Sequence, residues 1–191
     1  LSLKAIRDIL IHNNESTVII DEAYIDFGGD SAVSLIDGFP NLLIIQTFSK
    51  SRSLAGLRLG FAMGNENLIE ALNRVKNSIN SYTIDRLAIK AGIEAIKDEV
   101  WFQSTRQKII ATRERVVASL KAMGFKVINS EANFIFITHQ KCNAENLFKL
   151  LKKMGVLVRY FRKPGIDNYL RVSIGTDEEM DKFLDIISQI I

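Results

Sequence analysis

Two kinds of apolar pattern alternate along the chain. The segments 17–21 and 41–48 are short, continuous apolar runs rich in β-branched residues, typical of strands buried on both faces. Between and after them, apolar residues recur every three or four positions, which predicts amphipathic helices. Because strand and helix patterns alternate, the sequence predicts a fold of the α/β class.

The first part of the chain is predicted to contain three strands. Ser2 can cap a short helix that ends near Asn13, and a third strand is expected at 57–64. The link from Phe48 to Leu57 is shorter than the crossover of about a dozen residues that parallel strands need. The third strand is therefore expected to run antiparallel to the second or to lie elsewhere in the sheet.

A long helical pattern follows the three strands. One helix is predicted to start after Asn65, and helical periodicity then continues from 84 to 123. Gly92 and Asp98 are the positions where this run is expected to weaken, so it is predicted to form two helices, the second bridging two domains. Gly124 is predicted to end the second helix.

The remainder of the chain predicts a compact α+β unit. Its expected strands are 125–128, 133–138, 156–159 and 169–174, and its expected helices are 143–154 and 177–191. Thr176 and Glu179 have the spacing of a capping box at the start of the last helix. We therefore place a boundary inside the long helical run. Residues 1–112 are expected to form part of a larger domain with a mainly parallel sheet and helices, and residues 113–191 a small C-terminal α+β domain.

Composition indicates the cellular compartment in which the protein works. Of its 191 residues, 47% are hydrophobic and 25% are charged, which is ordinary for a soluble globular protein. No apolar run approaches the roughly 20 residues that span a bilayer, and the first residues lack the pattern of a signal peptide. The single cysteine, Cys142, cannot form an internal disulfide, which fits a reducing cytosol. We therefore expect a cytoplasmic protein without a membrane partner.

The net charge of +3 is unevenly distributed. Residues 97–163 contain fourteen Lys or Arg and five Asp or Glu, whereas the residues from 164 onward contain two and six. A basic segment can bind nucleic acid. Here, however, the charges are spaced through helical patterns without an aromatic platform or a binding motif. Solvated helix faces are the better interpretation, so no nucleic-acid partner is expected.

Candidate chemistry gathers where the first two predicted strands end. Asp21 and Tyr24 follow the first strand, and Ser49 and Lys50 follow the second. Ligands of open α/β sheets bind at the carboxyl ends of the strands, where a partly desolvated lysine amine can act as a nucleophile. Ser49 and Arg58 carry donors suited to phosphate. The pattern leaves three interpretations open: a solvated loop, an anion-binding turn, or the anchor of a covalent cofactor.

Three segments together resemble a known family. "DEAYIDF" (21–27), "TFSKSRSLAGLRLGFAMG" (47–64) and "VLVRYF…NYLRVSIGT" (156–176) are similar to the signature of the fold-type I, pyridoxal-phosphate-dependent aminotransferases of classes I and II. Within that superfamily the chain is most similar to the histidinol-phosphate aminotransferases. Members of the family are considerably longer at the N-terminal side. We therefore expect a truncated form that lacks the N-terminal part of its parent.

The resemblance implies a role for each candidate residue of the first part. Lys50 would be joined covalently to pyridoxal 5'-phosphate and would move a proton between substrate and cofactor. Asp21 would pair with the protonated pyridine nitrogen, and Tyr24 would hydrogen-bond the phenolic oxygen of the cofactor. Ser49 and Arg58 would bind its phosphate. Catalysis is thus expected from Lys50, Asp21 and Tyr24.

The resemblance also implies the substrates. Arg171 would bind the anionic group of the substrate, with Arg159 as a second positive group or, alternatively, as a surface arginine. The implied reaction is transamination of histidinol phosphate with 2-oxoglutarate by a homodimer. A phosphothreonine decarboxylase-type lyase and a non-catalytic, aminotransferase-like binding module remain as alternatives. His12 and His139 lack metal-ligand spacing relative to Cys142, so no metal site is expected.

Overall fold

Helix α4 (Glu99–Ala122) crosses from one unit of the chain into another in the computed structural model, which describes all 191 residues. The two units are Leu1–Ser104 and Thr105–Ile191. The boundary predicted from the sequence, between 112 and 113, lies in the same helix. No helix has both the length and the apolar composition that a bilayer crossing requires.

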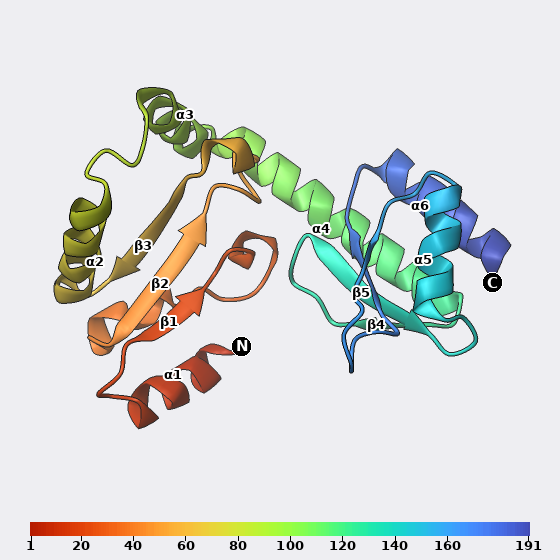
Figure 1. Ribbon diagram of the computed structural model, residues 1–191, viewed down its shortest axis with the longest axis horizontal. Helices are drawn as coiled ribbons and strands as arrows, with labels where there is room; N and C mark the ends of the chain where they lie inside the picture. Colours follow the sequence, from red (N-terminus) through yellow and green to blue (C-terminus); the bar gives the residue numbers. More distant parts are fainter. The chain divides into compact units, whose positions relative to one another are not determined.

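The first unit is built around a three-stranded sheet (Figure 1). Its strands are β1 (Val18–Asp21), β2 (Leu42–Thr47) and β3 (Gly60–Gly64), in that order across the sheet. Strand β2 pairs parallel to β1 and antiparallel to β3, which confirms the expected direction of the third strand. The helical elements are α1 (Leu3–His12), α2 (Glu66–Ile79), α3 (Arg86–Lys97) and the short 3₁₀ helices η1 (Ile25–Phe27), η2 (Ala32–Gly38) and η3 (Ala55–Leu57).

Along β1, helices close only one face of this sheet. Ile6 and Leu10 of α1 pack with Leu42 and Ile44 of β2, together with residues of η2. On the other face Ile19 is 58% exposed. The expectation that segment 17–21 is buried on both faces is therefore wrong: in β1 partly buried and exposed residues alternate, because α1 and η2 cover a single face.

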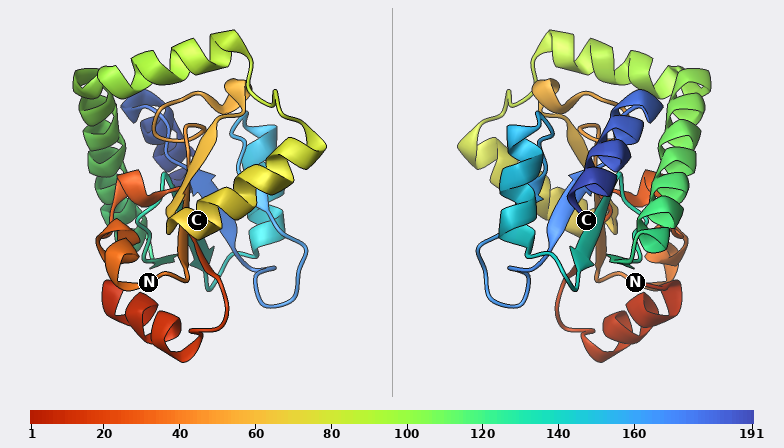
Figure 2. Two further views of the ribbon diagram at one scale, coloured as in Figure 1. Left: turned by 90° about the vertical axis from the view of Figure 1, so that its left-hand side faces the viewer. Right: turned by 90° about the vertical axis from the view of Figure 1, so that its right-hand side faces the viewer.

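The second unit is a four-stranded antiparallel sheet with helices on one face (Figures 1 and 2). Its elements after α4 are β4 (Phe125–Ile128), β5 (Phe134–His139), α5 (Ala144–Lys153), β6 (Arg159–Tyr160), β7 (Leu170–Ser173) and α6 (Asp177–Ile190), and the strand order is β4-β5-β7-β6. Alternate residues of β5 and β7, including Ile135 and Val172, form one core with Leu120, Leu151 and Ile187 of the three helices. This is the predicted α+β arrangement.

Local signals set most helix ends. Gly124 has φ +86° and follows α4, where only glycine adopts the left-handed backbone without strain. The predicted capping box of Thr176 and Glu179 opens α6. The helical run breaks at Asp98, as expected, whereas Gly92 lies inside an unbroken α3.

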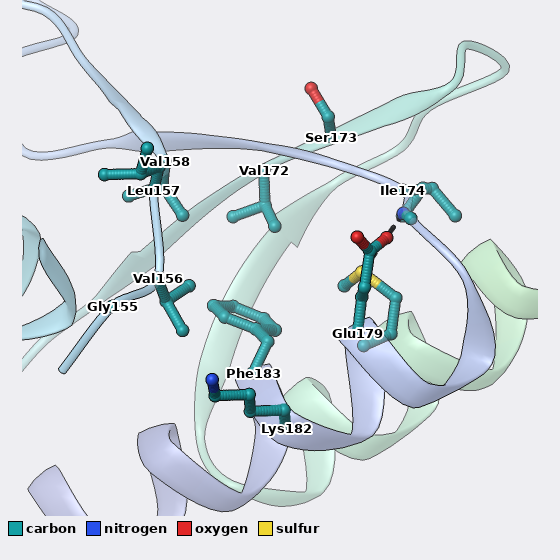
Figure 3. A pocket seen from close by; sticks show the side chains of 12 residues that line it. Gly155, Val156, Leu157, Val158, Val172, Ser173, Ile174, Glu179, Lys182 and Phe183 are labelled. Carbon is teal, nitrogen blue, oxygen red and sulfur yellow. Dashed lines mark hydrogen bonds between the residues drawn. The ribbon is translucent and has the colours of Figure 1, made fainter.

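The strand expected at 156–159 is largely wrong. Only Arg159 and Tyr160 pair with β7, as the short edge strand β6. Residues 155–158 instead form one wall of a cavity of about 450 Å³, whose other walls come from the end of β7 and the start of α6 (Figure 3). Apolar periodicity identified an extended segment but not its partner, because strand pairing is set by distant residues.

Candidate active site

Four of the predicted site residues line one cavity of the first unit. The cavity has a volume of about 350 Å³ and lies where β1 and β2 end. Its walls are formed by Asp21, Ala23, Ile45, Gln46, Thr47, Ser49, Lys50, Ala55 and Arg58. Because β1 and β2 are parallel neighbours, both chains leave the sheet at the same edge, the usual binding edge of an α/β sheet.

Asp21 is held at this edge by pairing and by a turn. It is the last residue of β1 and lies opposite Ile45 of β2. Its Oδ1 accepts a hydrogen bond from the backbone N–H of Ala23 at 3.0 Å, an arrangement in which aspartate stabilises the turn that follows a strand. The carboxylate is therefore fixed beside the cavity.

The loop after β2 folds back tightly on itself. Thr47 Oγ1 donates to the Leu59 carbonyl at 3.3 Å and accepts from the Ser49 N–H at 3.1 Å. The Phe48 carbonyl accepts from the Leu54 N–H at 3.0 Å. These bonds bring the chain back to the sheet edge, so that Lys50 and Arg58 line the same cavity although eight positions separate them.

Arg58 adopts a left-handed backbone conformation, with φ 56° and ψ 38°. A side chain other than glycine costs about 1–2 kcal/mol in this region. The conformation ends η3, and Arg58 Nη1 donates to the Ala55 carbonyl at 2.8 Å. A guanidinium has five N–H donors, so most of its donors are left for an anion in the cavity.

Tyr24 lies beside the lysine. The Lys50 Nζ is 5.2 Å from the centroid of the Tyr24 ring, within the range of a cation–π contact. Tyr24 follows Asp21 by three residues and precedes η1, so the loop after β1 brings a phenol to the lysine that follows β2. The structure thus groups all five predicted residues of the first unit.

Sequence reasoning missed the residues that hold these two loops together. Glu22 is buried, and its carboxylate accepts from the Ala32 N–H at 2.7 Å and from Ser31 Oγ and Gln46 Nε2 at 2.8 Å each. A second link between the two loops is the hydrogen bond that the buried Ser51 hydroxyl donates to the Asp26 carboxylate. An acid directly after Asp21 was the available signal for Glu22, but its three partners are distant in sequence.

Arg52 follows Lys50 by two positions but does not line the cavity. Its guanidinium lies 3.9 Å from the centroid of the Phe102 ring and donates to the Ala95 carbonyl. It also lies 3.7 Å from the Glu99 carboxylate. The basic residues of the loop therefore divide between a structural one, Arg52, and two that face the cavity.

The remaining predicted residues, Arg159 and Arg171, lie in the second unit. They are direct partners across β6 and β7, so both side chains project from the same face of that sheet. Arg171 Cζ lies 5.4 Å from the centroid of the Phe134 ring and 5.9 Å from that of Phe161, and Arg159 Cζ lies 5.5 Å from that of Phe161.

The donor set of the cavity fits an anionic aromatic cofactor. Arg58 and Ser49 supply positive charge and a hydroxyl for a phosphate, Asp21 supplies a carboxylate for a basic ring nitrogen, and Lys50 supplies a primary amine. No group of three or more His, Cys, Asp or Glu side chains is arranged to hold a metal ion. The chemistry available at this edge is therefore that of an amine, an acid and an anion clamp.

Comparison with known proteins gives one consistent relationship. Over its full length the chain is 62% identical to a histidinol-phosphate aminotransferase of Clostridium acetobutylicum, of which it covers 54%. The crystal structure of a histidinol-phosphate aminotransferase from Clostridium acetobutylicum that is 29% identical superposes with a TM-score of 0.87, covering 96% of this chain and 57% of that chain. The chain thus spans about half the length of the curated relatives it matches.

The fold itself is shared more widely. L-threonine-O-3-phosphate decarboxylase from Porphyromonas gingivalis superposes with a TM-score of 0.78 at 22% identity, covering 100% of this chain and 59% of that chain. At that identity the likeness describes the fold alone. The sequence pattern of one family, "Aminotransferase class I and II", matches residues 1–187. The chain therefore belongs to the class I and II aminotransferase family.

Proposed function

We propose that the whole protein, of which this chain covers the cavity edge and the second unit, is a pyridoxal-phosphate-dependent transaminase acting on histidinol phosphate and 2-oxoglutarate. One observation carries the proposal: Asp21, Ser49, Lys50 and Arg58 line a single cavity in a chain that is 62% identical, end to end, to a histidinol-phosphate aminotransferase. We further propose that it acts as a cytoplasmic homodimer, as the resemblance implies.

In this proposal each cavity residue has a separate task. Pyridoxal phosphate, when bound, supplies an electron sink for the negative charge that develops at the substrate carbon. The Asp21 carboxylate holds a proton on the ring nitrogen, and Tyr24 donates to the phenolic oxygen. Ser49 and Arg58 bind the phosphate through charge-assisted hydrogen bonds. Lys50 Nζ anchors the ring and, as a general base, takes and returns the proton at the reacting carbon.

The two arginines of the second unit would bind the substrate. A phosphate monoester carries up to two negative charges, and planar guanidinium forks match its oxygens. Arg171 is assigned to the anion of the amino donor, and Arg159 is the second positive group. The same pair would receive a carboxylate of 2-oxoglutarate in the second half of the reaction.

The experiment is a comparison of two lysine variants in the full-length protein. Lys50→Ala is expected to lower the rate of glutamate formation from histidinol phosphate and 2-oxoglutarate by at least about a thousandfold, because base and anchor are lost together. The exposed Lys121, which is in α4, serves as a matched control, and Lys121→Ala is expected to keep activity within about twofold. Borohydride reduction followed by peptide mass mapping is expected to place a pyridoxyl group on Lys50.

Product analysis separates the alternatives. Release of carbon dioxide in place of glutamate would assign the lyase reaction. A protein that binds no pyridoxal phosphate and is not labelled at Lys50 would be a non-catalytic binding module. Wild-type turnover by Lys50→Ala would refute the proposed role of the lysine.

A further inference from the structure

A row of four side chains crosses the open face of the second unit's sheet. Ile128 lies opposite Phe136, Phe136 opposite Arg171, and Arg171 opposite Arg159, so one row runs over all four strands. Directly opposite residues share a face. The other face carries the buried core residues, among them Ile135 and Val172. The row therefore ends in two neighbouring positive charges on a surface outside the core.

These two charges are not compensated by acids. Arg159 and Arg171 form no ion pair within 4.0 Å and donate no hydrogen bond to a protein group, and both guanidiniums lie against aromatic rings. Like charges directly opposite each other on neighbouring strands destabilise the pair. In this structure aromatic rings, rather than carboxylates, lie against the two guanidiniums.

Phe161 is the ring that both guanidiniums share. Arg159 Cζ is 5.5 Å and Arg171 Cζ is 5.9 Å from its centroid, and the negative face of an aromatic ring attracts cations at such distances. The ring is itself held in place, because its edge packs on Phe136 at 6.3 Å between centroids, and Tyr169 stacks on Phe136 at 4.7 Å. Phe161 thus links the edge strand to the aromatic residues of the open face.

We propose that Phe161 is a positioning residue that holds Arg159 and Arg171 together as one site for a dianion, and thereby selects phosphate monoesters over substrates with a single or no negative charge. The inference rests on the proposed function and adds to it the residue that sets substrate choice.

The selectivity follows from charge. A dianion neutralises both guanidiniums, whereas a monoanion neutralises one and leaves the other uncompensated. Arg159 is exposed and lies on a strand of two residues, so without the ring its long side chain is free to move into solvent. Loss of the ring should therefore weaken binding of dianions and leave binding of uncharged donors unchanged.

The test uses the full-length protein loaded with pyridoxal phosphate. Phe161→Leu removes the ring, and Phe161→Tyr keeps it. As a control, Phe148→Leu removes a ring of the same unit that stacks on Tyr160 and not on an arginine. KM and kcat are measured with histidinol phosphate and with histidinol. Inorganic phosphate and acetate are tested as dianionic and monoanionic competitive inhibitors, and melting temperatures report the fold.

For Phe161→Leu we expect the KM for histidinol phosphate and the inhibition constant of inorganic phosphate to rise about tenfold. The kcat, the KM for histidinol and the inhibition constant of acetate should stay within about twofold. Phe161→Tyr should restore the phosphate values, and Phe148→Leu should change only the melting temperature. An equal rise in KM for both donors, an unchanged phosphate constant, or no rescue by tyrosine would overturn the inference.

Failure of this inference and failure of the proposed function are distinguishable. If histidinol phosphate is not transaminated, the function fails, yet calorimetric titration of the loaded protein with inorganic phosphate still shows whether Phe161→Leu weakens the dianion site. If transamination proceeds and the phosphate constants of Phe161→Leu equal those of the wild type, only the role of Phe161 is refuted.

Discussion

The two units bury their apolar residues in different ways. In the second unit a single core joins the sheet to α4, α5 and α6. In the first unit the buried residues form separate smaller clusters, and α2 buries no residue at all although Leu72, Val75 and Ile79 lie on one stripe. Most of the exposed large apolar side chains of the chain belong to the first unit.

This difference shows how much of the tertiary packing can be inferred from the amphipathic pattern of a helix. The stripe of α2 predicts a face that requires cover, but it does not say which segment supplies the cover. In the second unit the stripes of α4, α5 and α6 all find cover on one sheet, although α4 and α6 are about sixty residues apart, and a single core forms. In the first unit the polar loops around the cavity are instead fixed by buried hydrogen bonds, such as those of Glu22.

The largest effect is expected from an isoleucine-to-alanine pair, one variant in each unit. Ile187 is 0% exposed in the core of the second unit, so Ile187→Ala should lower the free energy of unfolding by about 2–5 kcal/mol. Ile79 is 81% exposed on α2, so Ile79→Ala should change it by less than about 0.5 kcal/mol. Residue-resolved hydrogen exchange separates the two units. Equal losses of unfolding free energy in the two variants would show that the two units do not differ in how they bury apolar residues.

A smaller effect is expected from removing the buried acid of the first unit. Glu22→Ala deletes the acceptor of three hydrogen bonds and should lower the free energy of unfolding of that unit by about 2–3 kcal/mol. Glu15 is exposed, and Glu15→Ala should change it by less than about 0.5 kcal/mol. Denaturant titration followed by Trp101 fluorescence reports the first unit. If Glu22→Ala left the free energy of unfolding unchanged, the two loops would have to be held by other contacts.

The smallest effect concerns the polar edge of the second unit's core. The Thr112 hydroxyl, which donates to Asp177 at 2.8 Å, and then Arg115 lower the pKa of the Asp177 carboxyl below its ordinary value. Because the folded state binds its proton less readily than the unfolded state, this contribution is present above the unfolded pKa and is lost as pH falls through the folded pKa.

Thr112→Val should therefore raise the pKa of Asp177 and weaken the acid-dependent loss of stability, as followed by NMR titration of the carboxyl carbon. Ser119→Ala, which removes a hydroxyl of the same helix that bonds only to the Arg115 carbonyl, is the control and should leave the titration unchanged. A pKa of Asp177 that does not move in Thr112→Val would exclude the hydroxyl as its cause.

The sequence predicted those parts of the fold that depend on neighbours in the chain. The starts of α2, α5 and α6 follow from caps at Asn65, Asn143 and Thr176, because capping involves residues within one turn. The expected strand 156–159 and the burial of both faces of β1 were wrong. Both depend on which distant segment lies alongside, which apolar periodicity does not encode.

The candidate site divides in the same way. The carboxyl ends of two parallel strands meet at one edge, so strand order alone brings Asp21 and Lys50 together. Glu22, Gln46 and Ser51 were missed because they act through hydrogen bonds to residues distant in sequence, and the sequence does not reveal these partners. The roles of the predicted residues in catalysis stay predictions.

The backbone of Arg58 has a consequence for how this loop can evolve. Its left-handed conformation suits glycine, so selection for thermal stability alone favours glycine at this position. Glycine would remove the guanidinium from the cavity. Stability and anion binding therefore oppose each other at a single residue, and a stabilised variant obtained without a screen for binding would be prone to lose the cationic wall of the cavity first.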